Sequence, residues 1–161
     1  MPDIELRPVA REDRNRVSAF IVEHWGTDFV VAHGEVFRPH DLPGFVATDQ
    51  TGELLGLVTY SMHQNECEVV TLNSLQERVG IGTSLLQAVQ ELAVGRGCSR
   101  IWLMTTNDNL SALGFYQRRG YELVAVHRGA LAESRRIKPS IPVVSPNGIP
   151  MRDEIELELI L

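Results

Sequence analysis

A helix-like segment between two strand-like runs constrains the fold of this chain more than any other feature of its sequence. Across residues 80–94 the apolar side chains recur with a helical period. The apolar runs before and after it, residues 66–72 and 99–105, have the length and composition of strands. Two strands joined through a helix favour a parallel pair, because parallel strands need such a crossover. The sequence therefore predicts an α/β fold.

The rest of the chain is expected to form mostly antiparallel strands. Turn residues at 49–52 and 63–65 separate apolar runs closely enough for hairpins. We therefore expect a mixed, mostly antiparallel central sheet with one parallel pair around the helix at 80–94, in a single domain over residues 1–161. The remaining expected elements are strands at 3–9, 44–48, 53–62, 121–127 and 154–161, helices at 10–24, 110–119 and 129–138, an irregular segment at 27–43 and a loop at 139–150.

Charge and composition exclude several classes of function. The net charge of −6 disfavours nucleic acid or an anionic membrane as a partner, because both attract basic surfaces. No apolar run reaches the length of about 18 residues that spans a bilayer, and the acidic start of the sequence lacks a signal-peptide core. Cys67 and Cys98 have no metal-type spacing and are expected to be buried free thiols. A cytoplasmic protein without a metal is the expectation.

Two glycines at the start of the long helix point to a phosphate ligand. The first amides of a helix have no partner within it, and Gly80 and Gly82 let a ligand approach them closely. A P-loop is excluded because no Lys-Ser/Thr pair follows the glycines. A dinucleotide fingerprint would need a third glycine where Leu85 stands. The structural alternative is that both glycines only tighten the turn from strand to helix.

Residues 70–86 resemble the acetyl-CoA-binding motif of the GNAT N-acetyltransferases. In that family a strand ends in an apolar residue, and a loop of the form Gln/Arg-x-x-Gly-x-Gly/Ala opens a long helix. Glu77 occupies the Gln/Arg position here and brings a negative charge close to the phosphates. Arg78 or Gln76 is expected to compensate, while backbone amides do most of the holding.

A second segment resembles the other signature of the same family. Asn109, Ala112 and Tyr116 share one helical face, followed by Gly120 and Tyr121, as in the family pattern Asn-x-x-Ala-x-x-Phe/Leu-Tyr and Gly-Phe/Tyr. The two motifs also have the family's usual separation. Their coincidence is far more specific than either motif alone.

The resemblance implies a set of residues for acetyl-CoA, the expected co-substrate. The strand end pairs its backbone with the pantetheine arm, an N–H near Leu72 polarises the thioester oxygen, and Asn109 contacts the pantetheine. The implied contacts are Leu72, Asn73, Ser74, Arg78, Val79, Gly80, Ile81, Gly82, Thr83, Ser84, Asn109, Ala112, Phe115 and Tyr116.

Candidate catalytic and acceptor residues follow from the same resemblance. Tyr116 is expected to donate a proton to the leaving thiolate, with local packing as the alternative. Glu66 and Glu68 are candidates for the general base, on one strand face shared with Val70 and Leu72; a solvated strand end is the alternative. The expected substrate residues, or else surface histidines, are His24 and His33. The basic residues Arg118, Arg119, Arg135, Arg136 and Lys138 are expected to be solvated, with contact of one or two of them to the adenosine 3′-phosphate or an acidic acceptor as the alternative.

Three functions are therefore compared. The first is direct transfer of the acetyl group of acetyl-CoA to an amine in a ternary complex, with a small-molecule or peptide acceptor. The second is a non-catalytic acyl-CoA-binding module on the same fold. The third, a dinucleotide-dependent oxidoreductase, lacks the glycine that it requires. The acceptor depends on the segments 25–43 and 139–150, which identify no substrate, and homodimerisation stays open.

Overall fold

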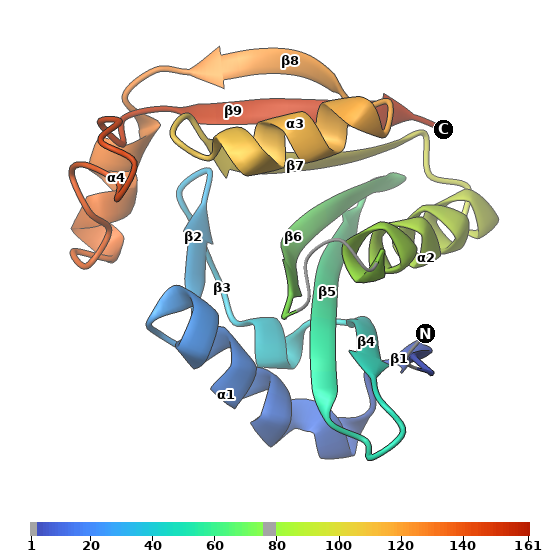
Figure 1. Ribbon diagram of the computed structural model, residues 1–161. Coiled ribbons are helices and arrows are strands. Elements are labelled where there is room, and N and C mark those ends of the chain that lie inside the picture. Colours follow the sequence, from blue (N-terminus) through green and yellow to red (C-terminus); the bar gives the residue numbers. More distant parts are fainter. Residues whose placement is uncertain (1–2, 76–79) are drawn as a thin grey trace. The chain divides into compact units, whose positions relative to one another are not determined.

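The computed structural model describes residues 3–75 and 80–161, and the chain divides into two compact units (Figure 1). One unit comprises residues 1–30, 38–101 and 161, and the other comprises residues 31–37 and 102–160. None of the helices described is long and apolar enough to cross a membrane. The expectation of one domain over residues 1–161 stays a prediction.

The first unit is built on four antiparallel strands in the order β1-β4-β5-β6. The strands are β1 (Glu5–Pro8), β4 (Gly44–Thr48), β5 (Leu54–His63) and β6 (Glu66–Ser74). Its helices are α1 (Arg14–Trp25) and α2 (Ile81–Gly95), with the short 3₁₀ turns η1 (Arg11–Asp13) and η2 (Pro39–Asp41).

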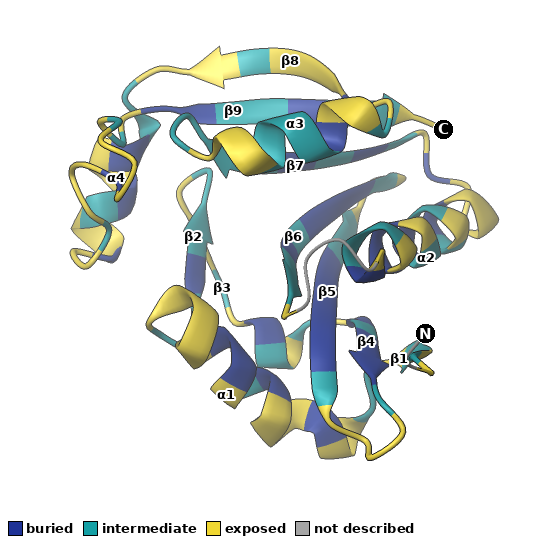
Figure 2. Cartoon of the chain, in the orientation of Figure 1, coloured by how far each residue is buried: buried dark blue, intermediate teal, exposed yellow. Residues whose placement is uncertain are grey.

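The two helices of this unit cover opposite faces of its sheet. Val17 and Ile21 of α1 pack in one buried cluster with Leu57 of β5. The neighbouring residue, Gly56, points the other way, and a Cβ there would lie 2.8 Å from Ile81 and 3.0 Å from Leu85 of α2. Figure 2 shows the buried stripe of each helix as dark blue segments. The absence of a side chain at Gly56 therefore sets how closely α2 approaches the sheet.

The parallel pair lies around α2, as predicted. The beginning of β7 (Arg100–Thr106) follows α2, and its first two residues belong to the first unit. The guanidinium of Arg100 donates to the carboxylate of Glu66 at 2.7 Å, and the Ser99 amide donates to the Asn65 carbonyl at 2.8 Å. Both strands thus begin side by side, which makes them parallel. A mixed α/β fold with a mostly antiparallel sheet is confirmed.

The second unit carries the strand order β7-β9-β8. Its elements are α3 (Leu110–Arg118), β8 (Glu122–His127), α4 (Ala130–Ile137) and β9 (Glu154–Ile160), with β8 and β9 antiparallel. Gly120 follows α3 with a φ of +91°, a conformation that favours glycine, and it ends the helix where predicted. The buried apolar residues of this unit include Leu103, Tyr116, Tyr121, Leu131 and Leu157.

The segment expected to be irregular, 27–43, contains a hairpin instead. Strands β2 (Val30–Ala32) and β3 (Glu35–Phe37) are joined by a two-residue turn at His33 and Gly34. Both turn residues have positive φ, 42° and 78°, which is the backbone of the tight hairpin turns. The strands are only three residues long, so their alternation carries too little signal to be recognised in the sequence.

An ion pair ties β1 to the beginning of α1. The carboxylate of Asp13 accepts two hydrogen bonds from Arg7, at 2.6 and 2.8 Å, and one from the Ala10 amide at 2.7 Å. The Asp13 side chain is buried. The hydrogen bonds from Arg7 are the main reason why the pKa of Asp13 falls from its ordinary 3.8 to about 2.

This ion pair predicts how the stability of the fold depends on pH. Since the pKa of Asp13 is lower in the folded chain, its contribution is complete above about pH 4 and is lost as the pH falls towards 2. Asp13→Asn should lower the free energy of unfolding at pH 7 by about 2 kcal/mol. Urea unfolding at pH 7 and at acid pH measures both effects. Asp41→Asn, at an exposed pair with Arg14, should cost under about 1 kcal/mol; equal losses for both variants would contradict the assignment.

Candidate active site

One group of predicted site residues lies in the first unit, where β6 leads into α2. Gly80 precedes the helix with a φ of +79°, and no side chain caps this helix end among the described residues. The first hydrogen bond of the helix runs from the Ser84 amide to the Gly80 carbonyl, at 3.0 Å. The amides of residues 81–83 therefore precede the helical ladder, at the positive end of the helix dipole. Such an end fits a phosphate group.

Part of the predicted cradle cannot be placed. Four residues of the motif lie outside the described residues: Gln76, Glu77, Arg78 and Val79. Among them is Glu77, the residue that departs from the family pattern. Leu72, Asn73 and Ser74 form the end of β6, as predicted. Ile81, Gly82, Thr83 and Ser84 form the first turn of α2. The described cradle thus consists of the end of β6, Gly80 and this first turn.

A bulge in β6 changes which residues share a face. Thr59 of β5 pairs with Thr71, and the next residue, Tyr60, pairs with Val69, so Val70 is an extra residue in β6. An extra residue shifts the alternation of side chains beyond it. Leu72 pairs with Val58 and therefore lies on the same face as Gly56, the face that α2 covers.

The candidate bases share a face, but not with the residues predicted. Glu66 lies opposite His63 and Glu68 opposite Ser61. His63 and Ser61 lie on the same face of β5 as Thr59 and Leu57, because all four are an even number of residues apart. Both glutamates therefore lie on the face towards α1, against which Leu57 packs. Their expected sharing of a face with Leu72 is wrong, because the bulge turns Thr71 and Asn73 to this side instead.

Glu66 and Glu68 differ in their surroundings. Glu66 is ion-paired with Arg100 and its side chain is 39% exposed, at the beginning of β6. Glu68 is buried with a residue exposure of 6%, two residues before the bulge at Val70. Glu68 is therefore the more buried of the two and lies nearer along β6 to Leu72, the predicted site of the thioester.

Two hydrogen bonds that the sequence did not reveal support this face of β6. The hydroxyls of Thr59 and Thr71, both buried, are 2.6 Å apart beside the bulge. The indole N–H of Trp25, at the end of α1, donates to the side-chain oxygen of Asn73 at 2.9 Å. Sequence alternation places Thr71 and Asn73 on the other face, so a prediction of these contacts would require recognition of the bulge.

A second group of predicted site residues lies on α3 of the second unit. The side chain of Asn109 accepts a hydrogen bond from the Ala112 amide at 3.1 Å and caps the helix. This contact gives the Asn-x-x-Ala spacing a structural reason. The guanidinium of Arg119 lies 3.6 Å from the centroid of the Phe115 ring and donates to the Phe115 carbonyl. Arg119, expected to be solvated, therefore packs on its own helix.

Tyr116 lies in an aromatic cluster. Its ring meets those of Phe115 and Tyr121 edge-on, at centroid distances of 5.1 and 5.5 Å. The residue is buried, and this burial raises the pKa of its phenol, with a further rise from Tyr121. The phenol therefore stays protonated across the neutral range.

The two candidate acceptor histidines have different environments. The Nδ1 atom of His24 lies at hydrogen-bond distance, 2.9 Å, from the Phe20 carbonyl oxygen, and the imidazole stacks on the Phe20 ring. His33 lies in the β2–β3 turn of the second unit, where its amide donates to both carboxylate oxygens of Glu154 at 3.2 Å. Its ring lies 5.4 Å from that of Trp102. The His24 side chain thus packs on its own helix, whereas the backbone amide of His33 is hydrogen-bonded to the buried carboxylate of Glu154.

Asn107 hydrogen-bonds to the backbone of residues 150–153, at the end of the loop predicted at 139–150. The Asn107 amide donates to the Asp153 carbonyl and its side-chain nitrogen donates to the Pro150 carbonyl. Its side-chain oxygen accepts from the amides of Arg152 and Asp153, at 3.0 Å each. Asn107 comes two residues before Asn109, so the loop is anchored on the turn that carries the second motif. An asparagine just after a strand is the only sequence signal for this contact.

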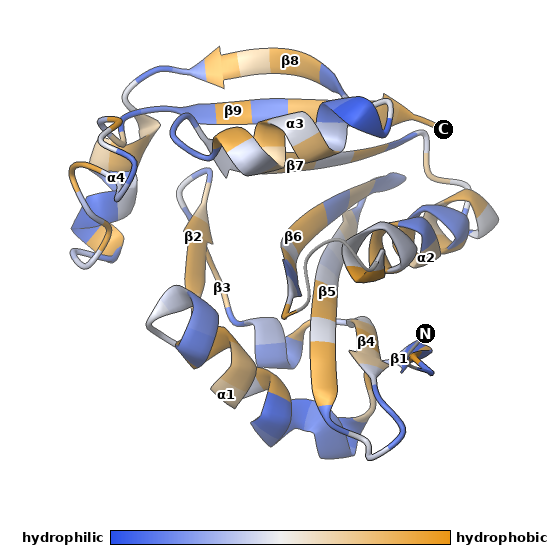
Figure 3. Cartoon of the chain, viewed as in Figure 1, coloured by the Kyte–Doolittle hydropathy of each residue, from blue (hydrophilic) through white to orange (hydrophobic). Residues whose placement is uncertain are grey.

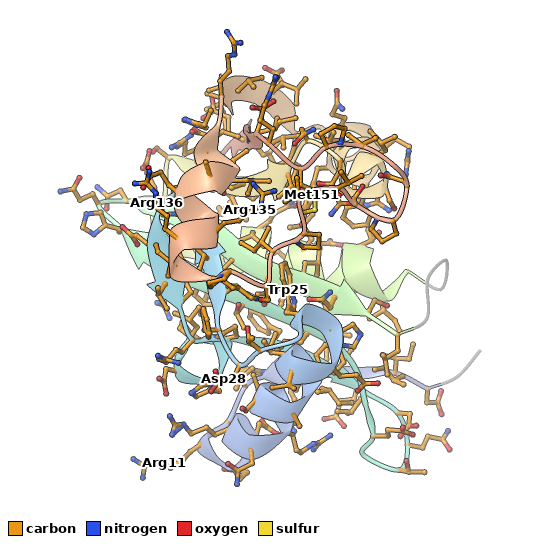
Figure 4. All side chains as sticks on the ribbon, turned by 90° about the vertical axis from the view of Figure 1, so that its left-hand side faces the viewer. Arg11, Trp25, Asp28, Arg135, Arg136 and Met151 are labelled. Atoms are coloured by element: carbon orange, nitrogen blue, oxygen red, sulfur yellow. The ribbon has the colours of Figure 1, made fainter. Side chains whose placement is uncertain are left out.

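Arg135 is partly buried and Lys138 is buried, whereas both were expected to be solvated. Arg135 of α4 donates to the carbonyls of Ile141, Pro142 and Met151, and Figure 4 shows it beside Met151. Lys138, the only lysine in the sequence, is buried just after α4, and this burial lowers its pKa. Arg136 remains exposed and pairs with Glu133. The Arg135 side chain therefore holds the loop through three carbonyls, and Lys138 is buried where sequence composition predicted surface charge.

The cysteines are buried and free, which confirms the prediction. Burial raises the pKa of the Cys67 thiol to about 12, so the reactive thiolate is scarce at neutral pH. Among residues 3–75 and 80–161, no group of three or more His, Cys, Asp or Glu side chains is arranged to hold a metal ion.

Comparison with known proteins identifies the family. Residues 7–121 match the model of the Acetyltransferase (GNAT) family. The chain belongs to this family. The acetyltransferase is 45% identical over 142 residues to the uncharacterized protein YdhI of Bacillus subtilis (strain 168), a match that covers 88% of this chain and 89% of YdhI.

Solved structures of acetyltransferases share the fold. The IAA acetyltransferase from Bacillus cereus ATCC 14579 superposes with a TM-score of 0.71 at 20% identity, over 99% of this chain and all of the other. A Bacillus subtilis acetyltransferase in complex with CoA gives a TM-score of 0.68 at 19% identity, over 100% of this acetyltransferase and 99% of that chain. The predicted GNAT-like fold is thus confirmed.

Proposed function

We propose that this acetyltransferase moves the acetyl group of acetyl-CoA directly to an amine of its acceptor in a ternary complex. The observation that carries the proposal is the beginning of α2, where Gly80 in a left-handed conformation precedes a helix end without a side-chain cap. Family membership identifies the class of reaction, and this helix end supports coenzyme A as the donor.

The residues at the junction of β6 and α2 fit the coenzyme. The amides of residues 81–83 would hold the pyrophosphate, and a Cβ at Gly80 would meet no atom within 4 Å, so the backbone there is accessible. The end of β6, Leu72 to Ser74, would pair with the pantetheine as an added strand does. Coenzyme A supplies the thioester, whose acetyl carbonyl is the electrophile. Arg78, Val79, Asn109, Ala112 and Phe115 remain predicted contacts.

Glu68 is the preferred general base. A primary amine is mostly protonated at neutral pH and must lose a proton before it attacks the carbonyl. Glu68 is buried, lies two residues before the bulge, and shares its face with Thr71 and Asn73. Glu66 is the first residue of β6, further from Leu72, and is ion-paired with Arg100. These surroundings favour Glu68 as the group that receives the amine proton, directly or through water.

Tyr116 would stabilise the leaving sulfur. As the new C–N bond forms and the C–S bond breaks, negative charge builds on the sulfur, and a phenol can donate a hydrogen bond to it. Because burial raises the pKa of Tyr116, full transfer of its proton to a thiolate becomes less favourable. The donated hydrogen bond is thus expected to contribute more than complete proton transfer.

A direct attack is preferred over an acetylated enzyme. A ping-pong reaction needs a nucleophile on the protein, and Cys67 lies on β6, the strand that leads to the predicted coenzyme site. Its raised pKa of about 12 and its burial make it a poor nucleophile at neutral pH. The roles of His24 and His33 at the acceptor stay predictions, as does the identity of that acceptor.

Coenzyme binding is the first test. Acetyl-CoA at about 100 times its Kd should stabilise the folded chain by about 2.7 kcal/mol and raise Tm by several degrees, whereas NAD should not. Gly80→Ala should weaken this response, since a side chain is strained at a φ of +79°. Gly95→Ala in the same helix, where a Cβ meets nothing, is the matched control. No shift with any CoA ester would refute the proposal, and binding without thiol release from an amine panel would indicate a non-catalytic module.

The base assignment predicts unequal effects of two glutamate substitutions. Glu68→Gln should lower kcat/KM for an accepted amine by about 10²–10⁴-fold, because the amide cannot take a proton. Glu66→Gln should leave it within about threefold, since this residue pairs with Arg100. Thiol release under steady-state conditions measures both variants. A larger loss with Glu66→Gln would reverse the assignment.

The role of Tyr116 predicts a loss of turnover without a loss of coenzyme. Tyr116→Phe removes only the hydroxyl and should lower kcat by about 10²-fold, with the Kd of acetyl-CoA within about threefold. Tyr60→Phe, at another buried tyrosine, is the control and should retain kcat. Steady-state thiol release gives kcat, and calorimetric titration gives the Kd of acetyl-CoA. An unchanged kcat in Tyr116→Phe would exclude Tyr116 as the hydrogen-bond donor to the leaving sulfur.

A further inference from the structure

Strand β8 exposes an apolar edge of the second unit. Within the described part of the chain, β8 pairs with β9 and with no other strand, so its outer backbone groups have no strand neighbour. Leu123, Val124 and Val126 are exposed by 56%, 46% and 59%. Figure 2 shows β8 mostly in the colour of exposed residues, and Figure 3 shows its centre as hydrophobic. Open apolar edges of this kind invite pairing with another strand.

A bulge makes this edge nearly symmetric about its centre. Leu123 pairs with Leu157 and Ala125 with Glu156, so Val124 is an extra residue in β8. Because the bulge shifts the alternation, Leu123 and Val126 lie on one face, opposite Leu157 and Ile155 of β9. The residues outside them, Glu122 and His127, lie together on the other face, opposite Glu158 and Glu154.

We infer that β8 pairs antiparallel with the β8 of a second copy of this chain, about a two-fold axis between Val124 and Ala125. This register places Leu123 opposite Val126 of the second copy and Glu122 opposite His127, with matching faces in each pair. In a strand without the bulge, residues three apart would point to opposite faces and this register would mismatch them. The inference is independent of the proposed function.

Charge favours a second copy as the occupant. Glu122 lies directly opposite Glu158 in the same chain, and like charges in this position are destabilising. His127 and Arg128 follow at the other end of β8. His127 Nε2 already lies 3.1 Å from a carboxylate oxygen of Glu156 in the same chain. Antiparallel self-pairing brings Arg128 near Glu122 of the other copy, so each end of the pair gains an opposite charge. The Leu123 and Val126 side chains of both copies contact each other across the pair and lose part of their exposure in the same step.

The oligomeric state tests this interface. Analytical ultracentrifugation should show a concentration-dependent dimer of twice the 18.0 kDa chain mass, because a six-residue strand is a small contact. Val126→Arg should weaken dimerisation by at least about tenfold in Kd, as two charges would enter the apolar centre. Val94→Arg, at an equally exposed apolar position on α2, should leave it unchanged. A monomer at every concentration, or a dimer indifferent to Val126→Arg, would overturn the inference.

Disulfide trapping tests the register. Mixing Leu123→Cys with Val126→Cys under oxidising conditions should give a cross-linked dimer, because these positions face each other across the axis. Either variant alone should not cross-link through the new thiol, since identical residues would be about 10 Å apart along the strands. Circular dichroism of each variant confirms folding. Cross-linking by either variant alone, or its absence from the mixture of folded variants, would exclude this pairing.

Discussion

Val70 is an extra residue in β6 that has no partner in the ladder with β5. This bulge decides which side chains of β6 lie on each face of the sheet. With regular alternation, the face that carries Glu68 would also carry Val70 and Leu72. The bulge instead turns Thr71 and Asn73 to that face, where Thr59 and Trp25 hold them by hydrogen bonds. Leu72 turns to the opposite face, which α2 covers. The strand thus presents polar groups towards α1 and apolar groups towards α2, at the strand end where the coenzyme motif begins.

The sequence predicted the elements that have long periods or clear ends. The apolar stripe of α2 and the glycines beside it are visible in the sequence, as is the Asn-x-x-Ala spacing that caps α3. The β2–β3 hairpin was missed because each strand has only three residues, and its turn has glycine at one position only. Bulges at Val70 and Val124 were missed because an extra residue leaves no mark in hydrophobicity.

The candidate site divides in the same way. Residues that act through a local pattern, such as Gly80 and Asn109, were found from spacing. The side chains of Asn107, Arg135 and Asp153 bond instead to backbone groups 43, 16 and 24 residues away, at Pro150, Met151 and Gly129. Such contacts require that residues far apart in sequence be placed first, so no short motif encodes them. The buried position of Lys138 has the same origin, since composition alone suggests surface charge for a lysine.

The burial of Lys138 also limits acylation of the protein's own side chains by acyl donors. The other 14 basic side chains are arginines, whose guanidinium groups stay protonated and are poor nucleophiles. The lysine that remains is buried, so activated acyl donors meet no exposed ε-amine on this protein. Acyl label transferred in an assay would therefore accumulate on the acceptor with little background on the enzyme. Amine-directed dyes, for the same reason, would report on the amino terminus and on opening of the segment after α4.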